Sequence, residues 1–230
     1  MCTLTIHINV GRTLVTMNRD EQRSRPVEHA PYLWEKHNIL APQDTKAGGT
    51  WIAMNDASLI ACLLNGYRAD DTDKAFKTRG EIIPYILSQP EPSKAMRNLD
   101  YKGYGSFHLI LIDHNIVKTY SWDGKDIKIS EWPNQEWYFF TSSSFKQTEV
   151  QQIRRDRFKT WLEEGALFQG FLPTIHCQRE DEKPAHSVLM SRDDACTKSI
   201  TQFEITAKEK VYRYWPTPHE NVDKYNQSQF

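Results

Sequence analysis

Two segments of the chain are apolar at nearly every position, and they limit the folds that it can adopt. They read "SLIACLLN" (residues 58–65) and "SFHLILID" (residues 106–113). A strand that alternates polar and apolar residues buries one face, whereas a continuous apolar run is buried on both faces. Sheets made from these strands need cover on both sides. We therefore expect an α+β fold, a four-layer αββα sandwich in which two antiparallel sheets lie between outer helices.

The other patterns fit alternating blocks of strands and helices. Residues 2–10 alternate polar and β-branched side chains, a Gly-Arg turn follows, and residues 13–17 return as a second strand. An amphipathic helix is predicted for residues 149–164. The segment 21–49 is rich in proline and polar residues and is predicted to be irregular, whereas "HSVLMS" (residues 186–191) is predicted to be a strand.

The chain of 230 residues shows no internal repeat, long linker or low-complexity tract. Its length and its ordinary content of 39% hydrophobic and 26% charged residues fit one globular domain. We predict a single domain over residues 1–216. The polar residues 217–230 are predicted to be a frayed tail.

Charge and hydropathy exclude several classes of partner. The net charge of −1 gives no strong field for nucleic acid or for an anionic membrane surface. The densest basic group, "IRRDRFK" (residues 153–159), is predicted to be the solvated face of a helix rather than a phosphate-binding patch. No window approaches the run of about 20 apolar residues that a membrane span needs. The chain also begins without a secretory signal, so we expect a cytoplasmic protein.

Four widely spaced cysteines, without any C-x-x-C pair, indicate reduced thiols rather than a disulfide framework. No Cys/His cluster has the spacing of a zinc site, so no metal is expected. Three of these cysteines lie far from the start of the chain. The fourth, Cys2, directly follows the initiator methionine.

The position of Cys2 allows a specific chemistry. Methionine aminopeptidases remove Met1 when the second residue is small, and this would give Cys2 a free α-amine beside its own thiol. An α-amine titrates about one pH unit below a typical thiol, so it can serve as the general base. For an arbitrary protein, however, a cysteine at this position is an incidental residue at the start of a strand.

The predicted hairpin brings "NRDE" (residues 18–21) back towards Cys2. Arg19 beside the thiol would favour the thiolate, and Asp20 or Glu21 could orient the amine or the guanidinium through charge-assisted hydrogen bonds. Asn65 ends an apolar strand and could donate to an oxyanion. The alternative for these residues is a solvated turn and, for Asn65, a simple turn residue before Gly66.

Taken in order, these residues resemble a known family. "MCT" at the start, "NRDE", Arg25-Pro26, "GGTW" (residues 48–51) and "LLN" (residues 63–65) are markers of the NRDE family. That family includes the transport and Golgi organisation protein 2 group of eukaryotes and many bacterial proteins. The markers cover the first 70 residues, and the later strand and helix order is compatible with the family through about residue 215.

The resemblance implies a branch of the amino-terminal-nucleophile hydrolases, near the bile-salt and penicillin amidases. In those enzymes a mature amino-terminal cysteine attacks an amide, and Cys2, Arg19 and Asn65 match their residues one by one. The acid matches less well, because Asp20 adjoins Arg19 where the amidases leave a gap, and Glu21 is the alternative. A second asparagine of the amidases is replaced here by a serine, Ser142 or its neighbour Ser143.

The sequence therefore predicts a cysteine amidohydrolase that cleaves a C–N amide bond of a small molecule. Cys2, Arg19, Asp20 and Asn65 are the predicted catalytic residues. The predicted substrate-binding residues are Asn18, Glu21, Trp51, Tyr67 and Ser142, with an aromatic pocket beside the 21–49 loop.

The resemblance also implies an alternative without catalysis. Family members are linked to haem trafficking, so the same fold could carry haem or another lipophilic ligand. Hydrolysis requires no cofactor, and haem would then be the cargo. The chain has no C-x-x-C-H haem signature, and His7 and His108 are predicted to be satisfied sheet residues rather than axial ligands. Nothing in the sequence indicates an oligomeric state.

Overall fold

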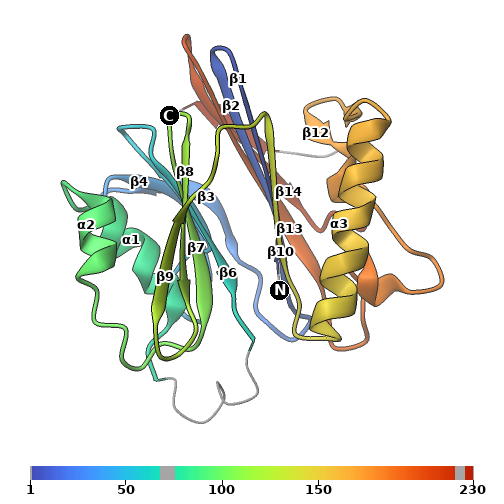
Figure 1. Ribbon diagram of the computed structural model, residues 1–230, viewed down its shortest axis with the longest axis horizontal. Coiled ribbons are helices and arrows are strands. Elements are labelled where there is room, and N and C mark those ends of the chain that lie inside the picture. Colours follow the sequence, from blue (N-terminus) through green and yellow to red (C-terminus); the bar gives the residue numbers. More distant parts are fainter. Residues whose placement is uncertain (1, 68–75, 221–225, 230) are drawn as a thin grey trace. The chain divides into compact units, whose positions relative to one another are not determined.

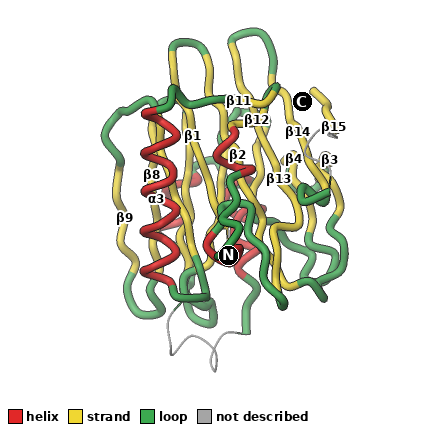
Figure 2. Tube along the Cα trace, turned by 90° about the vertical axis from the view of Figure 1, so that its right-hand side faces the viewer, coloured by secondary structure: helices red, strands yellow, loops and turns green. Residues whose placement is uncertain are grey.

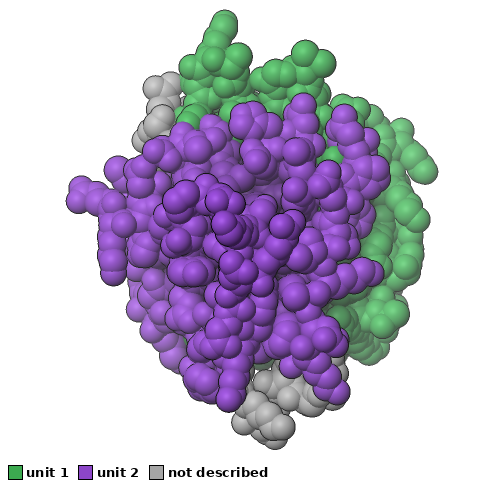
Figure 3. Space-filling view, turned by 60° about the vertical axis from the view of Figure 1, so that its left-hand side comes forward, with its two compact units in different colours: residues 1–25, 136–229 green, residues 26–135, 230 purple. Residues whose placement is uncertain are grey.

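The structure is a computed structural model that describes residues 2–67, 76–220 and 226–229. The chain divides into two compact units. Unit 1 combines residues 1–25 with residues 136–229, and unit 2 consists of residues 26–135 (Figure 3). The first strands of the chain thus belong with its last strands, although more than 100 residues separate them in the sequence.

Unit 1 is built on a six-stranded antiparallel sheet with the order β10-β1-β2-β13-β14-β15 (Figure 1). Its strands are β1 (Cys2–Asn9), β2 (Arg12–Gln22), β10 (Trp137–Ser142), β13 (Ala195–Thr206), β14 (Lys210–Pro216) and β15 (Asn226–Gln229). The predicted hairpin is confirmed, with β1 and β2 paired from Cys2 and Arg19 down to the turn. Because β10 and β13 flank it, this hairpin forms the middle of the sheet rather than an edge.

One face of this sheet carries the helix α3 (Gln147–Glu163), which runs beside β10 in Figure 1 and lies in front of the strands in Figure 2. Val150, Phe158 and Trp161 on the helix are buried. The ring of Phe158 stacks on that of Phe139 with 4.6 Å between centroids. The predicted amphipathic helix is therefore present, and its aromatic residues attach it to the sheet.

The segment after α3 returns across the same face. It contains β11 (Phe168–Gln169), β12 (Leu172–Pro173) and the 3-10 helices η2 (Thr174–Cys177) and η3 (Pro184–His186). The predicted strand over residues 186–191 was wrong, because this stretch ends η3 and then runs irregularly. Its backbone bonds go to the loop instead, as from the Leu189 N–H to the Gln178 carbonyl at 2.9 Å.

Unit 2 contains a seven-stranded antiparallel sheet in sequential order. Its strands are β3 (His29–Trp34), β4 (Ile39–Gln43), β5 (Ile52–Asn55), β6 (Ile60–Asn65), β7 (Phe107–Asp113), β8 (Ile116–Trp122) and β9 (Ile127–Glu131). The helices are η1 (Arg79–Glu81), α1 (Ile82–Leu87) and α2 (Pro92–Arg97). Apolar residues of α1 and α2 pack with one face of β5, β6 and β7. Residues on the opposite face, such as Cys62 and Ile110, are also buried, as their continuous apolar pattern predicts.

Two predictions at the ends of these sheets were wrong. The segment 21–49 is not irregular throughout, because it contains β3 and β4. Pro31 in β3 obscures the strand pattern, and the pairing with β4 is displaced between His29 and Tyr32. The tail is not frayed throughout either, because β15 pairs with β14 and so completes the backbone hydrogen bonds of that strand.

The predicted class is confirmed, since the chain has an α+β fold with two large antiparallel sheets and few helices. Helices pack on one face of each sheet. Within the described part of the chain, no helix is both long enough and apolar enough to cross a bilayer.

Candidate active site

Cys2 lies at the first position of β1, in a row of residues that crosses the sheet of unit 1. It pairs with Ser142 of β10 on one side and with Arg19 of β2 on the other. Directly opposite residues in antiparallel strands point to the same face, so the side chains of Ser142, Cys2 and Arg19 share a face. All three are buried, with exposed fractions of 2%, 7% and 4%. The structure thus brings together the predicted nucleophile, its cationic support and one predicted substrate contact.

The thiol of Cys2 is held in its neutral form. Burial raises its pKa, and the negative charge of Asp20 acts in the same direction. The backbone N–H of Asp20, which bonds to the thiol, and the charge of Arg19 oppose this rise without cancelling it. A base is therefore needed to produce the thiolate near neutral pH. Removal of Met1, which would supply that base as an α-amine, stays a prediction because Met1 lies outside the described residues.

The two acids of the "NRDE" segment lie on opposite faces of the sheet, because they are neighbours on one strand. Glu21 shares the face of Cys2, and its Oε2 is 3.5 Å from Nη2 of Arg19. Asp20 points to the face that carries α3, where it accepts a hydrogen bond from Oγ1 of Thr197 at 2.6 Å. Its Oδ2 is 3.6 Å from Nη2 of Arg154. Glu21 is therefore the acid that pairs with Arg19 beside Cys2, whereas Asp20 acts on the thiol through its charge and its backbone.

Asn18 was predicted to bind substrate, and the structure places it elsewhere. It is fully buried and points to the α3 face, opposite to Cys2. Its amide donates to the carbonyls of His176 at 3.1 Å and Val188 at 3.0 Å. Both amide hydrogens are used in this way, so Asn18 fastens the segment after α3 to the sheet and has no donor left for a substrate.

Three predicted site residues belong to unit 2. Asn65 is the last residue of β6 and is half-buried, and Tyr67 two residues later is also half-buried. Trp51 is buried, and its carbonyl accepts a hydrogen bond from the Leu63 N–H at 2.8 Å. The roles of these three residues stay predictions.

The structure distinguishes the two serines at the end of β10. The Ser143 hydroxyl donates to the Phe145 carbonyl at 2.6 Å and accepts from the Phe145 N–H at 3.1 Å, so it closes a turn. The Ser142 hydroxyl is buried and has no hydrogen-bond partner among the described residues. A buried hydroxyl in this condition is costly unless a ligand or water satisfies it. Of the two, Ser142 is the donor available to a bound molecule on the Cys2 face.

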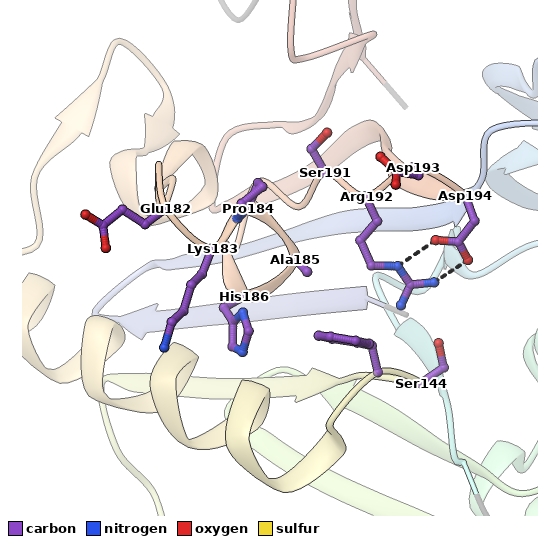
Figure 4. Close-up of a pocket in the computed structure, with 11 residues that line it drawn as sticks. Ser144, Glu182, Lys183, Pro184, Ala185, His186, Ser191, Arg192, Asp193 and Asp194 are labelled. Carbon is purple, nitrogen blue, oxygen red and sulfur yellow. Dashed lines mark hydrogen bonds and ion pairs between the residues drawn. The ribbon is translucent and has the colours of Figure 1, made fainter.

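A pocket of about 640 Å³ lies at the same end of the unit 1 sheet (Figure 4). It is bounded by residues 144–145 after β10, residues 182–186 around η3 and residues 191–194 before β13. Arg192 and Asp194 pair within it at 2.5 Å, as the dashed lines in Figure 4 show. Ser142, which pairs with Cys2, precedes this wall by two residues. Its η3 wall packs on α3, where Nε2 of His186 is 3.1 Å from Oε1 of Glu149, so the pocket lies on the α3 face and not on the Cys2 face. Sequence reasoning did not predict this pocket, because it placed the binding site beside the 21–49 loop.

Sequence reasoning also missed Arg154. It lies in the segment that was predicted to be solvated, yet its side chain is completely buried. A helix brings residues four apart to the same face, and Arg154 lies four residues after Val150 and four before Phe158. The period of the apolar stripe could therefore have predicted the burial of this arginine.

A second residue that the sequence did not indicate is His176. Its ring lies between Oγ1 of Thr5 at 2.7 Å and Oδ1 of Asn18 at 2.7 Å. Burial lowers the pKa of His176 to about 3, so the ring is neutral. Since Oδ1 of Asn18 only accepts, Nδ1 carries the proton and Nε2 accepts from Thr5. No sequence motif marked this residue.

His7 and His108, which were predicted to be sheet residues, lie on strands and have hydrogen-bond partners. Nε2 of His7 is 3.0 Å from Oε1 of Glu136, and Nδ1 of His108 is 2.9 Å from the hydroxyl of Ser121. Among the residues that the structure describes, no three His, Cys, Asp or Glu side chains gather as a set of metal ligands.

Comparison with known proteins gives a family match, curated relatives and solved structures of the same fold. The model of the family described as Transport and Golgi organisation 2 matches residues 1–222. The human Transport and Golgi organization protein 2 homolog is 30% identical over 116 residues, which cover 48% of this chain and 42% of that protein. The homolog from Bos taurus is 28% identical over the same shares. The chain thus matches less than half the length of these curated relatives.

Two solved structures share the fold. Penicillin V acylase from Agrobacterium tumefaciens has a TM-score of 0.51 at 15% identity, over 94% of this chain and 83% of that chain. The Caenorhabditis elegans ortholog of N-acylethanolamine-hydrolyzing acid amidase has a TM-score of 0.57 at 13% identity, over 87% and 92%. At these identities the likeness shows the fold alone, which is that of the amino-terminal-nucleophile hydrolases.

Proposed function

The chain belongs to the Transport and Golgi organisation 2 family, and we propose that it is a cysteine hydrolase that cleaves a C–N amide bond of a small molecule through Cys2. One observation carries this proposal. Cys2 stands between Ser142 and Arg19 in one row across the sheet, with all three side chains on the same face. Nucleophile, hydroxyl donor and cation thus meet where an amide carbonyl could be attacked.

In the proposed reaction the α-amine of the mature Cys2 takes the thiol proton, and Sγ attacks the amide carbon. The Ser142 hydroxyl donates to the oxygen on which negative charge develops. The C–N bond then breaks, its electron pair leaves with nitrogen, and the α-amine returns the proton to that nitrogen. Water adds to the resulting thioester and gives up a proton to the same amine. The acid leaves and the thiol is restored.

The neutral buried thiol is consistent with this sequence of steps, because a resting thiolate is then not required. The Arg19–Glu21 pair holds the guanidinium beside the nucleophile.

The test is hydrolysis of a panel of N-acyl amides by the purified chain and by Cys2→Ala. We expect the wild type to release amine and Cys2→Ala to release none. Cys196→Ala is the matched control, because Cys196 lies half-buried on β13 opposite Glu21 and should leave the rate unchanged. Mass spectrometry of the wild type should show loss of Met1 and, after rapid quenching, an acyl group on the Cys2 peptide.

Hydrolysis by Cys2→Ala at the wild-type rate would contradict the proposal. Retention of Met1 in the purified wild-type chain would contradict it as well. The predicted haem carrier is the competing outcome of the same experiment. It would show no hydrolysis in any variant, together with a saturable spectral change when haemin is added. That binding would persist in Cys2→Ala unless the thiolate is itself a haem ligand.

A further inference from the structure

The most unusual charge in unit 1 is the guanidinium of Arg154. It lies on α3 and faces the sheet, and neither it nor its acidic partner Asp20 exposes any part of its side chain. Burying a charge is expensive unless other groups compensate it. The exposed arginine at the next position, Arg155, donates instead to Oε1 of Gln151 on its own helix, at 2.9 Å. The burial of Arg154 therefore needs an explanation, whereas the solvent-exposed charges of α3 need none.

The guanidinium contacts three strands at once. Its Nη1 donates to Oγ1 of Thr3 and to Oγ1 of Thr141, each at 3.1 Å. Its Nη2 is 3.6 Å from Oδ2 of Asp20. Its Nε donates to the carbonyl of His186 at 3.3 Å. The two threonine hydroxyls are also 3.0 Å from each other, so β1 and β10 are joined here both directly and through the arginine.

These three contacts have a fixed relation to the candidate active site. Thr3 follows Cys2, Thr141 precedes Ser142, and Asp20 follows Arg19. Neighbouring residues on a strand point to opposite faces, so each site residue has an Arg154 contact directly beside it, on the other side of the sheet. One side chain thus holds the backbone of all three strands at the level of the site.

We propose that Arg154 is a positioning residue for Cys2: from the opposite face of the sheet, its guanidinium fixes the strand ends that place the thiol between Ser142 and Arg19. The catalytic importance of this positioning rests on the proposed function. The placement of Arg154 and its effect on the thiol are measurable whether or not the chain hydrolyses an amide.

Two physical effects support this role. The planar fork of arginine can serve several acceptors at fixed angles, which a lysine ammonium cannot do. Its positive charge also lies beside Asp20, whose negative charge raises the pKa of the Cys2 thiol. Loss of the arginine would leave that negative charge without its neighbouring cation, so the thiol would become harder to ionise.

The experiment measures alkylation of Cys2 by iodoacetamide as a function of pH, followed by mass spectrometry on the Cys2-containing peptide of the full chain. The variants are Arg154→Met, Arg154→Lys and the matched control Arg155→Met. We expect Arg154→Met to raise the midpoint of the profile by about one pH unit, which lowers alkylation at neutral pH about tenfold. Arg154→Lys keeps a cation near Asp20 but loses the contacts with Thr3 and Thr141, so its midpoint should lie between those of the wild type and Arg154→Met. Arg155→Met should match the wild type.

An unchanged or lowered midpoint in folded Arg154→Met would overturn the inference, even with a reduced melting temperature, because a purely structural arginine would affect stability alone. A midpoint in Arg154→Lys equal to that of the wild type would overturn it too, because the positive charge alone would then account for the effect. If Arg154→Met fails to fold, Thr3→Val replaces it, since it removes one acceptor and keeps the side-chain shape. Alkylation at neutral pH should then fall about threefold, in line with one weakened hydrogen bond, and no fall would reject the role.

Failure of this inference and failure of the proposed function give different results. A chain that hydrolyses no amide but shows the midpoint shift keeps Arg154 as the residue that positions Cys2 and loses only the hydrolase assignment. A hydrolase whose Cys2 profile is indifferent to Arg154 keeps the assignment and loses the positioning role.

Discussion

At the scale of single residues, the loss of the Ser142 hydroxyl should affect stability and activity differently. Its buried hydroxyl has no hydrogen-bond partner among the described residues. Ser142→Ala removes a polar group that folding leaves unsatisfied, so the free energy of unfolding should stay within about 0.5 kcal/mol of the wild type or rise. If the hydroxyl donates to the oxyanion, amide hydrolysis should fall about 100-fold in the same variant. Urea unfolding and steady-state kinetics measure the two quantities.

The neighbouring serine provides the control for this prediction. Ser143 exchanges two hydrogen bonds with the backbone of Phe145. Ser143→Ala should therefore lower the free energy of unfolding by about 1 kcal/mol and change hydrolysis little. A Ser142→Ala variant that loses stability and keeps full activity would show that its hydroxyl serves the fold and not the reaction.

His176 should make the chain sensitive to acid. Its folded-state pKa of about 3 lies below the ordinary value of 6.5, so the unfolded chain binds the extra proton between these limits. The contribution of His176 is complete above pH 6.5 and is lost as the pH falls towards 3, with a slope that approaches about 1.4 kcal/mol per pH unit. His176→Gln should flatten the fall of the unfolding free energy over this range. A fall of the unfolding free energy in His176→Gln that is as steep as in the wild type would contradict the prediction.

How far the sequence predicts the site depends on the periodicity of each element. Cys2 and Arg19 face the same side because the hairpin register follows from a short turn, and that much could be read from the pattern. The two-residue period of a strand assigns Asp20 and Glu21 to opposite faces of the sheet. This assignment requires β2 to continue through Gln22, whereas the sequence predicted a strand only as far as residue 17. Contacts between distant segments, such as Asn18 with His176, are set by how the loop after α3 crosses the sheet, which no local pattern specifies.

At the scale of elements, the "GGTW" motif has a packing reason. A Cβ on Gly49 would lie 2.5 Å from the backbone carbonyl carbon of Gly80, and the Thr50 N–H donates to the Gly80 carbonyl at 3.0 Å. The strand entry and the start of η1 thus meet backbone to backbone, with room for no side chain. The motif therefore fixes where the helical segment begins relative to β5.

This contact predicts a large cost for the smallest substitution. Gly49→Ala should lower the free energy of unfolding by about 3 kcal/mol. The nearest atoms to the new methyl group are backbone atoms of Gly80, which can move away only if the local backbone is distorted. Gly48→Ala is the matched control. Gly48 has a φ of +73° and open space around it, so its variant should lose only about 1 kcal/mol through backbone strain. Chemical denaturation measures both, and equal losses would exclude the proposed contact.

Elements were predictable where burial matches a simple period. The strands β6 and β7 are apolar on both faces, and both of their faces are buried as this pattern requires. The strands β3 and β4 were missed because Pro31 and the displaced pairing at His29 break the alternation. The segment after α3 was misread for the opposite reason, because its apolar run at residues 188–190 is buried by packing rather than by strand pairing.

At the scale of the whole molecule, strands from the first 25 residues and from residues 136–229 form one sheet, so Cys2, Arg19 and Ser142 come from distant parts of the sequence. In the sheet of unit 1, β1 and β2 are interior strands that lie between β10 and β13. In the sheet of unit 2, β3 and β9 are the edge strands. Interior strands bond on both sides and open only with extensive unfolding, whereas edge strands open locally. The hairpin that carries Cys2 and Arg19 should therefore belong to the most protected part of the chain.

Hydrogen exchange followed by mass spectrometry checks this expectation. Amides of β1, β2 and β13 should exchange most slowly in unit 1, and those of β9, whose side chains are largely exposed, should exchange fastest among the strands of unit 2. Arg154→Lys should speed exchange at the start of β1 and the end of β10, where its contacts to Thr3 and Thr141 are lost, and leave the middle of β2 unchanged. If β1 exchanges as fast as β9 in the wild type, the nucleophile is not held by the sheet, and a site preorganised by its strands is excluded.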